Sequence, residues 1–124
     1  MEKLHVNDLN EAKNVINLAM ITGQMLIKNG AEIYRAEDTI ERMCAGVEEI
    51  REVEVFGLSS AIFVSAQYTG ETITMFKDIE SQGVHLSRID ALNSFSRRFV
   101  AGEFSLEEAK KELLSISTLE KCPI

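Results

Sequence analysis

The chain has 124 residues and a net charge of −7 at pH 7, and this length is typical of one domain. An acidic surface repels phosphate backbones and anionic lipid head groups, so the composition argues against nucleic-acid binding and electrostatic docking on a membrane. The longest apolar runs, residues 18–21 and 61–64, are far shorter than the roughly 20 residues of a membrane-spanning helix. We therefore predict a single soluble domain over residues 1–124 that spans no membrane as given.

The first third of the chain predicts two helices. Asp8 with Glu11 resembles a capping box at the start of the first helix. Asn29-Gly30 is a typical helix end, because glycine readily takes the left-handed conformation. Between these ends the apolar stripe is wide, which predicts a helix packed on more than one side. A second helix follows after a short link, as in an αα-hairpin. Its apolar face comprises Ile33, Ala36, Ile40, Met43, Cys44 and Val47.

The middle of the chain changes from a helical period to a period of two residues, which is typical of strands. Residues 52–56, 61–66 and 72–77 are rich in β-branched and aromatic side chains. Turn-forming residues separate them. These segments predict an antiparallel meander with helices covering one face.

Two more helices are predicted in the last third. Apolar residues recur at helical spacing from Leu86 to Val100, and Gly102 is the predicted stop. Ser105 with Glu108 forms a capping box for the fourth helix. The inward residues of that helix are predicted to be Ala109, Leu113 and Ile116. The predicted fold is α+β in the order ααβββαα, with helices packed on a small antiparallel sheet of three strands and a fourth strand left open.

Side chains suited to catalysis are scarce. The only histidines are His5 and His85, and the chain has no nucleophile elbow, P-loop, zinc-protease or dinucleotide-binding motif. Cys44 and Cys122 fit no zinc or CxxC spacing. Cys44 is predicted to be a small core residue, and a disulfide between the two cysteines is left open. We predict no catalytic residue, no metal site, no cofactor and a reducing compartment.

Three polar clusters are candidate binding sites: residues 30–38, residues 93–97 on the third helix, and the serines around the second strand. Arg35 and Arg97 carry guanidinium groups that can grip a carboxylate. The alternative, which we favour, is internal ion pairing. The candidate ion-pair partners are Glu32, Glu37 and Glu103. The candidate binding residues are Glu32, Tyr34, Arg35, Glu37, Asp38, Ser60, Ser65, Asn93, Ser96 and Arg97.

Four stretches cover most of the chain and are informative as a set. They are GAEIYRAEDTIERM (residues 30–43), VEVFGLSSAIFVSA (53–66), TGETITMFKDI (69–79) and LSRIDALNSFSRRFVAGEFSLEEAKKEL (86–113). In this order they resemble the N-terminal domain of the bacterial threonine/serine exporter (ThrE-like) family. The chain departs from the family pattern at residues 59–61, where Ser-Ser-Ala replaces a segment similar to Pro-Thr-Gly. A family site built on that segment would be altered here.

The resemblance implies more than the residues do alone. Proteins of this family are similar to exporters of threonine and serine, and some relatives are linked to dicarboxylate export. They continue into several transmembrane helices, or use a small, separately encoded membrane partner. The chain would then be excised from a longer multi-pass protein of the inner (cytoplasmic) membrane, with this domain on the cytoplasmic side. Homo-oligomers are expected, and nucleic acid is not an expected partner.

Three functions follow as hypotheses. The first is a gating, assembly or cargo-gathering module of a bacterial amino-acid exporter, which is not an enzyme. The second is a small hydrolase, which requires a serine and a histidine within hydrogen-bond distance. The third is an oligomerisation domain that uses an apolar patch left uncovered on the first helix.

Overall fold

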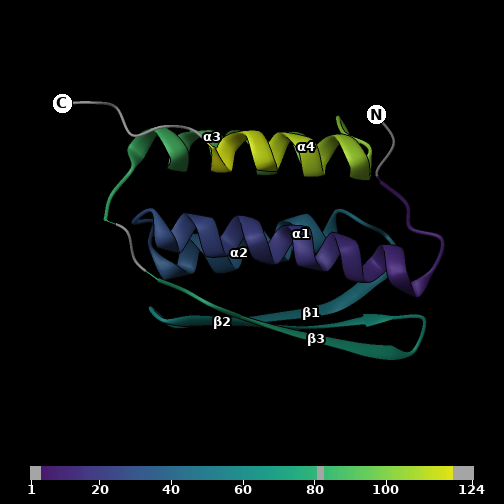
Figure 1. Cartoon of the computed structure of the whole chain (residues 1–124). Coiled ribbons are helices and arrows are strands. Elements are labelled where there is room, and N and C mark those ends of the chain that lie inside the picture. Colours follow the sequence, from purple (N-terminus) through teal and green to yellow (C-terminus); the bar gives the residue numbers. More distant parts are fainter. Residues whose placement is uncertain (1–3, 81–82, 119–124) are drawn as a thin grey trace.

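The computed structural model describes residues 4–80 and 83–118. Its elements follow the order ααβββαα, which confirms the predicted α+β fold. They are α1 (Leu9–Lys28), α2 (Ile33–Ala45), β1 (Ile50–Gly57), β2 (Ala61–Tyr68), β3 (Glu71–Asp78), α3 (Leu86–Val100) and α4 (Leu106–Ser117). Figure 1 shows three layers: the sheet, the pair α1 and α2 above it, and the pair α3 and α4 above those.

Helix α1 begins and ends where the sequence predicts. The Asp8 carboxylate accepts a hydrogen bond from the Glu11 amide at 2.8 Å, and the Glu11 carboxylate accepts one from the Asn7 amide at 2.9 Å. In a capping box the Glu11 side chain would accept from the amide of the N-cap residue Asp8; here it accepts from the amide of Asn7, one residue earlier. At the other end, Asn29 caps the helix and Gly30 takes φ +100°, as expected for a left-handed C′ residue.

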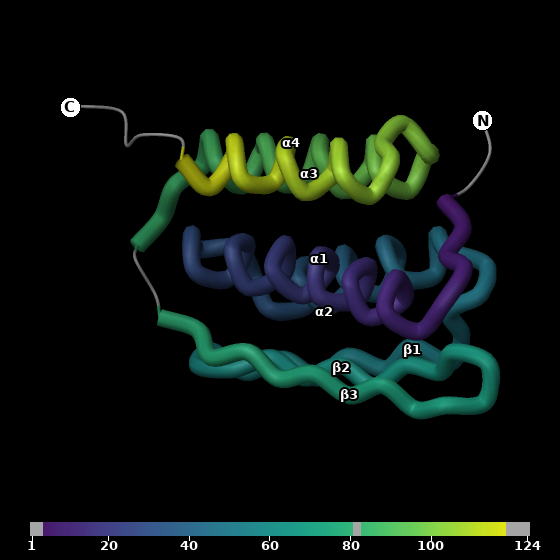
Figure 2. Tube along the Cα trace, turned by 45° about the vertical axis from the view of Figure 1, so that its right-hand side comes forward, coloured from purple at the N-terminus to yellow at the C-terminus, as the bar shows by residue number. Residues whose placement is uncertain are grey.

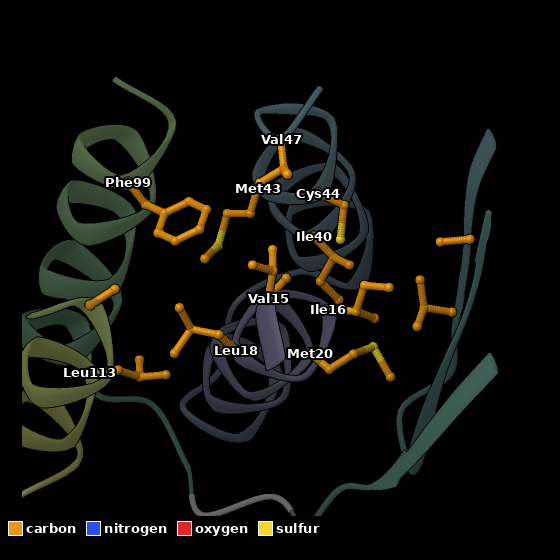
Figure 3. Close-up of a cluster of buried hydrophobic side chains, with 14 of the residues drawn as sticks. Val15, Ile16, Leu18, Met20, Ile40, Met43, Cys44, Val47, Phe99 and Leu113 are labelled. Carbon is orange, nitrogen blue, oxygen red and sulfur yellow. The ribbon is translucent and has the colours of Figure 1, made fainter. Parts of the chain in front are cut away.

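Helix α1 is the central element of the core. It contacts α2, the strands β2 and β3, and both helices of the outer layer. In Figure 3, Leu18 points toward Phe99 and Leu113, whereas Met20 points toward the strands. This arrangement confirms that α1 packs on more than one side. None of the large hydrophobic side chains that are exposed in the described residues lies on α1, but a mostly apolar cavity borders this helix, so an oligomerisation patch there stays a prediction.

The contact between α1 and α2 is close because of one glycine. A Cβ atom built on Gly23 would lie 2.4 Å from Cδ1 of Ile40, so no larger residue fits without displacing the Ile40 side chain. Gly23 is fully within the helix, where glycine is otherwise unfavourable. The position therefore serves helix–helix packing.

The sheet is a three-stranded antiparallel meander in the order β1-β2-β3, with no fourth strand in the described ranges. Each strand extends one to two residues beyond its predicted bounds on at least one side, because the cross-strand ladder continues into the turns. A register shift between Arg51 and Glu54, with Glu52 at φ 51°, forms a bulge that alternation alone does not reveal. The buried inward residues on β2 and β3 are Ile62, Val64, Ala66, Tyr68 and Ile73.

The outer helical layer also matches its sequence signals. Helix α3 ends at Val100 and is followed by Gly102 at φ 79°. Ser105 and Glu108 form a complete capping box at the start of α4, with bonds of 2.9 and 3.1 Å. The predicted inward residues Ala109, Leu113 and Ile116 are all buried.

Cys44 is a fully buried core residue, as predicted, and its thiol is free. Cys122 lies outside the described residues. Burial raises the pKa of the Cys44 thiol from 9.0 to about 12, so its reactive thiolate is scarce at neutral pH. In a Cys122→Ser variant we expect native Cys44 to resist iodoacetamide at about pH 8 and to react fully in urea. Mass spectrometry measures the added group, and rapid labelling of the native chain would contradict the prediction.

Candidate functional site

A polar cleft lies between α2 and α3. Its volume is about 330 Å³, which suits a small molecule. We refer to it as the α2–α3 cleft. In Figure 2, α3 lies above α2 at the rear of the molecule and α4 lies above α1 at the front. The cleft is lined by Arg35, Asp38, Thr39 and Arg42 from α2 and by Asn93, Ser96, Arg97 and Val100 from α3.

Helical spacing explains why these residues converge. On each helix the lining residues recur three, four and seven positions apart, which places them on one face. The other face of α2 carries Ala36, Ile40 and Met43, which are buried against the core. On α3 the buried residues are Leu92, Phe95 and Phe99. Because the apolar faces fix the rotation of both helices, the polar faces meet at the seam between them.

The cleft carries excess positive charge. It holds three guanidinium groups and one carboxylate, although the whole chain is acidic. The Asp38 carboxylate is paired with Arg42 at 2.9 Å, and both side chains are exposed. Arg35 has its guanidinium carbon 5.8 Å from the centre of the Tyr34 ring. The guanidinium groups of this cleft that form no ion pair with the described residues are available to an anionic ligand.

The favoured prediction of internal ion pairs for Arg35 and Arg97 is wrong. Within the described ranges neither arginine forms an ion pair. Glu103 pairs with the neighbouring Arg98 at 3.2 Å. The Glu37 carboxylate instead accepts a hydrogen bond from the Gly57 amide at 2.8 Å, which ties α2 to the end of β1. Arg97 and Arg98 are neighbours in the sequence but project from different sides of α3. Arg98 therefore meets Glu103 while Arg97 faces the cleft.

The structure brings together half of the candidate binding residues. Those in the cleft are Arg35, Asp38, Asn93, Ser96 and Arg97. Thr39 and Arg42 also line the cleft but were not among the predicted binding residues, although both lie on the same helical face as Arg35. The Ser96 hydroxyl donates to the Asn93 carbonyl at 2.9 Å, so its oxygen keeps lone pairs for a ligand.

The other candidates lie elsewhere. Glu32 is the N-cap residue of α2 and its side chain makes no capping bond. Tyr34 is exposed beside the cleft without lining it. Ser60 lies in the β1–β2 turn, where its carbonyl accepts from the Ile79 amide at 2.9 Å. Ser65 is on β2, opposite Glu54 and Thr74 on the neighbouring strands. These residues do not form one site with the cleft.

A second cavity, between α1 and α4, differs in chemistry. Its volume is also about 330 Å³. Most of its surface is apolar, and among the described residues that line it Lys110 is the only charged one. The cavity lacks paired groups of opposite charge that would orient a polar solute. The α2–α3 cleft is therefore the stronger candidate site.

The hydrolase hypothesis gains no geometric support from the described residues. The His85 amide donates to the Asn29 carbonyl at 2.9 Å. Its ring makes no hydrogen bond to any serine within residues 4–80 and 83–118. His5 bonds the Glu49 carboxylate at 2.8 Å. A serine nucleophile needs a base within hydrogen-bond reach, and no such pair involving His85 occurs there.

Near the start of the chain, His5, Glu48 and Glu49 place ligand atoms within 4.8 Å of one another. Hydrogen bonds of Glu49 explain why it lies close to His5. Glu49 accepts from the His5 ring at 2.8 Å and from the Val6 amide at 3.0 Å. These bonds anchor the segment before α1 to the α2–β1 link. The three side chains are exposed or half-buried, and exposed acidic groups often cluster without an ion.

The Glu49 contacts predict a pH dependence of stability. The His5 bond and then the Val6 amide bond hold the pKa of Glu49 below its usual value of 4.5. A lowered pKa stabilises the fold fully above the unfolded-state value, and this contribution is lost as pH falls through the folded-state value. We expect the urea midpoint of the wild type to approach that of Glu49→Gln as pH falls from about 5.5 to 3. A constant difference across this window would contradict the prediction.

No helix within the described ranges has the length and apolar character needed to cross a bilayer. A comparison with protein families matches residues 17–123 to the family described as "Putative threonine/serine exporter" (ThrE). No curated protein and no solved structure matches the chain. Because the family match covers nearly the whole sequence and agrees with the resemblance of its four stretches, the chain belongs to the ThrE family of threonine/serine exporters.

Proposed function

We propose that the chain is the extramembrane, cargo-gathering domain of an amino-acid exporter, and that the α2–α3 cleft binds the solute. The observation that carries this proposal is the family match over residues 17–123. The cleft supports the cargo-gathering role over gating or assembly, because it presents polar groups of both charges to solvent.

The chemistry of the cleft fits a free amino acid. At neutral pH such a solute carries a carboxylate and an ammonium group. The guanidinium groups of Arg35 and Arg97, which form no ion pair among the described residues, are suited to the carboxylate. Asp38, which shares its charge with Arg42, is suited to the ammonium. The hydroxyl and amide groups of the lining are suited to a side-chain hydroxyl such as that of threonine or serine.

A dicarboxylate is the second candidate cargo. It is favoured by the excess of guanidinium groups over carboxylates in the cleft, since two carboxylates could each meet an arginine. In that case the exporter subunit would carry dianions. The same three arginines would be used, but Asp38 would repel the ligand instead of attracting it.

The proposal extends to the setting of the domain. By resemblance to the family, the domain would lie on the cytoplasmic side of the inner membrane. It would connect to transmembrane helices beyond residue 124 or work with a small membrane partner. Only the resemblance to the family supports this setting.

The transport test uses cells that lack the parent gene. After loading with threonine or serine, these cells should retain more of the solute than wild-type cells, and the full-length gene should restore export. A gene carrying Arg97→Gln should restore it poorly, while Arg98→Gln should restore it fully, because Arg98 bonds Glu103 outside the cleft. Unchanged retention of threonine, serine and dicarboxylates in the deletion strain would refute the proposed function.

A further inference from the structure

The outer face of the sheet is open. Helices α1 and α2 cover one face, and Figure 1 shows no described element against the other. We define the outer sheet face as the side chains of β1, β2 and β3 that point away from α1 and α2. We propose that this face binds the same face of a second copy of this chain. The proposal is independent of the proposed function.

Three phenylalanines form one row across the outer sheet face. The register pairs Phe56 with Phe63 and Phe63 with Phe76. The rings of Phe63 and Phe76 lie 4.8 Å apart. Their residues are exposed by 61%, 45% and 50%, respectively. Single exposed apolar residues are ordinary, but a contiguous aromatic row on an open sheet is typical of an interaction surface.

The rows beside the phenylalanines are polar and nearly neutral in sum. One row holds Glu54, Ser65 and Thr74, by cross-strand pairing. The next row holds Arg51, Gln67 and Thr72, in which the Gln67 amide donates to the Thr72 hydroxyl at 2.7 Å. Each row thus has one charged side chain on β1 and a hydroxyl on β3. A partner fits this face best when it places uncharged hydroxyl groups opposite the charged side chains of β1.

A second copy matches this pattern under one symmetry. A two-fold axis parallel to the strands and over β2 sets β1 of each copy against β3 of the other, and β2 against itself. Phe63 then faces Phe63 of the second copy, and Phe56 faces Phe76. In the polar rows, Glu54 faces the Thr74 hydroxyl and Arg51 faces the Thr72 hydroxyl. No like charges oppose each other in these three rows, so the face is complementary to itself.

The size of the face predicts a weak dimer. Eight-residue strands at the usual spacings give a face of roughly 400 Å² per copy. A pair therefore buries on the order of 800 Å² in total, below the about 1,200 Å² at which stable interfaces begin. Two aligned sheets pack face to face in this way in β-sandwiches. We expect association that depends on concentration.

Sedimentation equilibrium of the 124-residue chain tests the association. From low micromolar to near millimolar concentration, the average mass should rise from one chain toward two. Phe63→Ser should raise the dissociation constant at least about tenfold, because Phe63 lies on the proposed axis. Leu114→Ser is the matched control, since Leu114 is 66% exposed on α4 and should not affect the dimer. A wild type that is monomeric throughout, or a dimer unaffected by Phe63→Ser, would overturn the proposal.

Cross-linking tests the symmetry separately. In a Cys122→Ser background, Ser65→Cys places a thiol on the axis, where it meets its own copy, while buried Cys44 stays unreactive. A short bismaleimide should therefore cross-link the Ser65→Cys chain into dimers. Thr72→Cys is on the same face but faces Arg51 of the second copy, so its yield should be far lower. Equal yields at the two positions would refute the proposed axis, and circular dichroism confirms that each variant is folded.

Discussion

Replacing Arg97 by glutamine is expected to weaken binding of L-threonine to the chain by roughly ten- to a hundredfold, the usual value of a hydrogen-bonded charge contact. Arg97 lines the α2–α3 cleft and has no ion-pair partner among the described residues, so its charge is free to meet a carboxylate. Glutamine keeps a hydrogen-bond donor but removes the charge. Chemical shifts in an NMR titration of the 124-residue chain measure the dissociation constant.

Arg98→Gln is the control for this experiment. Arg98 is the next residue on α3 and has the same side chain, but its guanidinium bonds Glu103 at 3.2 Å and stacks 4.6 Å from the Phe104 ring. It lies outside the cleft. Its replacement should leave the dissociation constant within about twofold, as expected for a residue that does not touch the ligand. Equal losses in the two variants, or no binding by the wild type, would contradict cargo binding in the cleft.

Asp38→Asn separates the two candidate cargoes. If Asp38 meets the ammonium of an amino acid, the variant should bind threonine more weakly. If the ligand is a dicarboxylate, removal of the Asp38 charge should strengthen binding, because it removes repulsion and frees Arg42 from its 2.9 Å pair. Succinate and threonine, titrated against the same two proteins, give opposite signs. The ligand that the wild type binds more tightly identifies the chemical class of the cargo, and the direction of its change in Asp38→Asn shows whether Asp38 attracts or repels it.

The sequence predicts the elements well because their signals are local. The Ser105–Glu108 capping box and the Gly30 helix end each depend on a few neighbouring residues, and both are confirmed. The strand ends are less predictable. Residues such as Ile50 and Tyr68 join the ladder only because a partner strand lies opposite. The bulge at Glu52 breaks the alternation that was used to identify β1.

The site is harder to predict because it is formed between elements. Arg35 and Arg97 are separated in the sequence by all three strands of the sheet, and only the packing of α2 against α3 brings them to one cleft. Helical spacing places Arg42 on the face of Arg35, yet the sequence alone cannot say what lies opposite that face. The row of phenylalanines is hard to predict for the same reason, because it is formed between strands. Each reads as an ordinary strand residue, and only the register aligns them.

Phe95→Ala is expected to have the largest effect on stability, a loss of about 3–5 kcal/mol. Phe95 is 1% exposed on α3. Its ring lies 6.3 Å from that of Phe99 and 5.4 Å from that of Phe104, which follows the helix. Truncation removes these contacts and leaves a cavity that the surrounding helices cannot fully fill. Urea denaturation at fixed pH measures the free energy of unfolding.

Phe56→Ala is the matched control, because it removes the same atoms from a residue that is 61% exposed on β1. At a concentration where the chain is monomeric, Phe56→Ala should lower the free energy of unfolding by about 1 kcal/mol or less, through lost strand propensity alone.

The buried aromatic face of α3 also supports the cleft. Asn93, Ser96 and Arg97 lie on the opposite side of the helix that Phe95 anchors, so Phe95→Ala should weaken cargo binding only where it also unfolds the chain. Equal losses of stability in the two variants would show that α3 is not held by its buried aromatic face, and the geometry of the cleft would then lack its support.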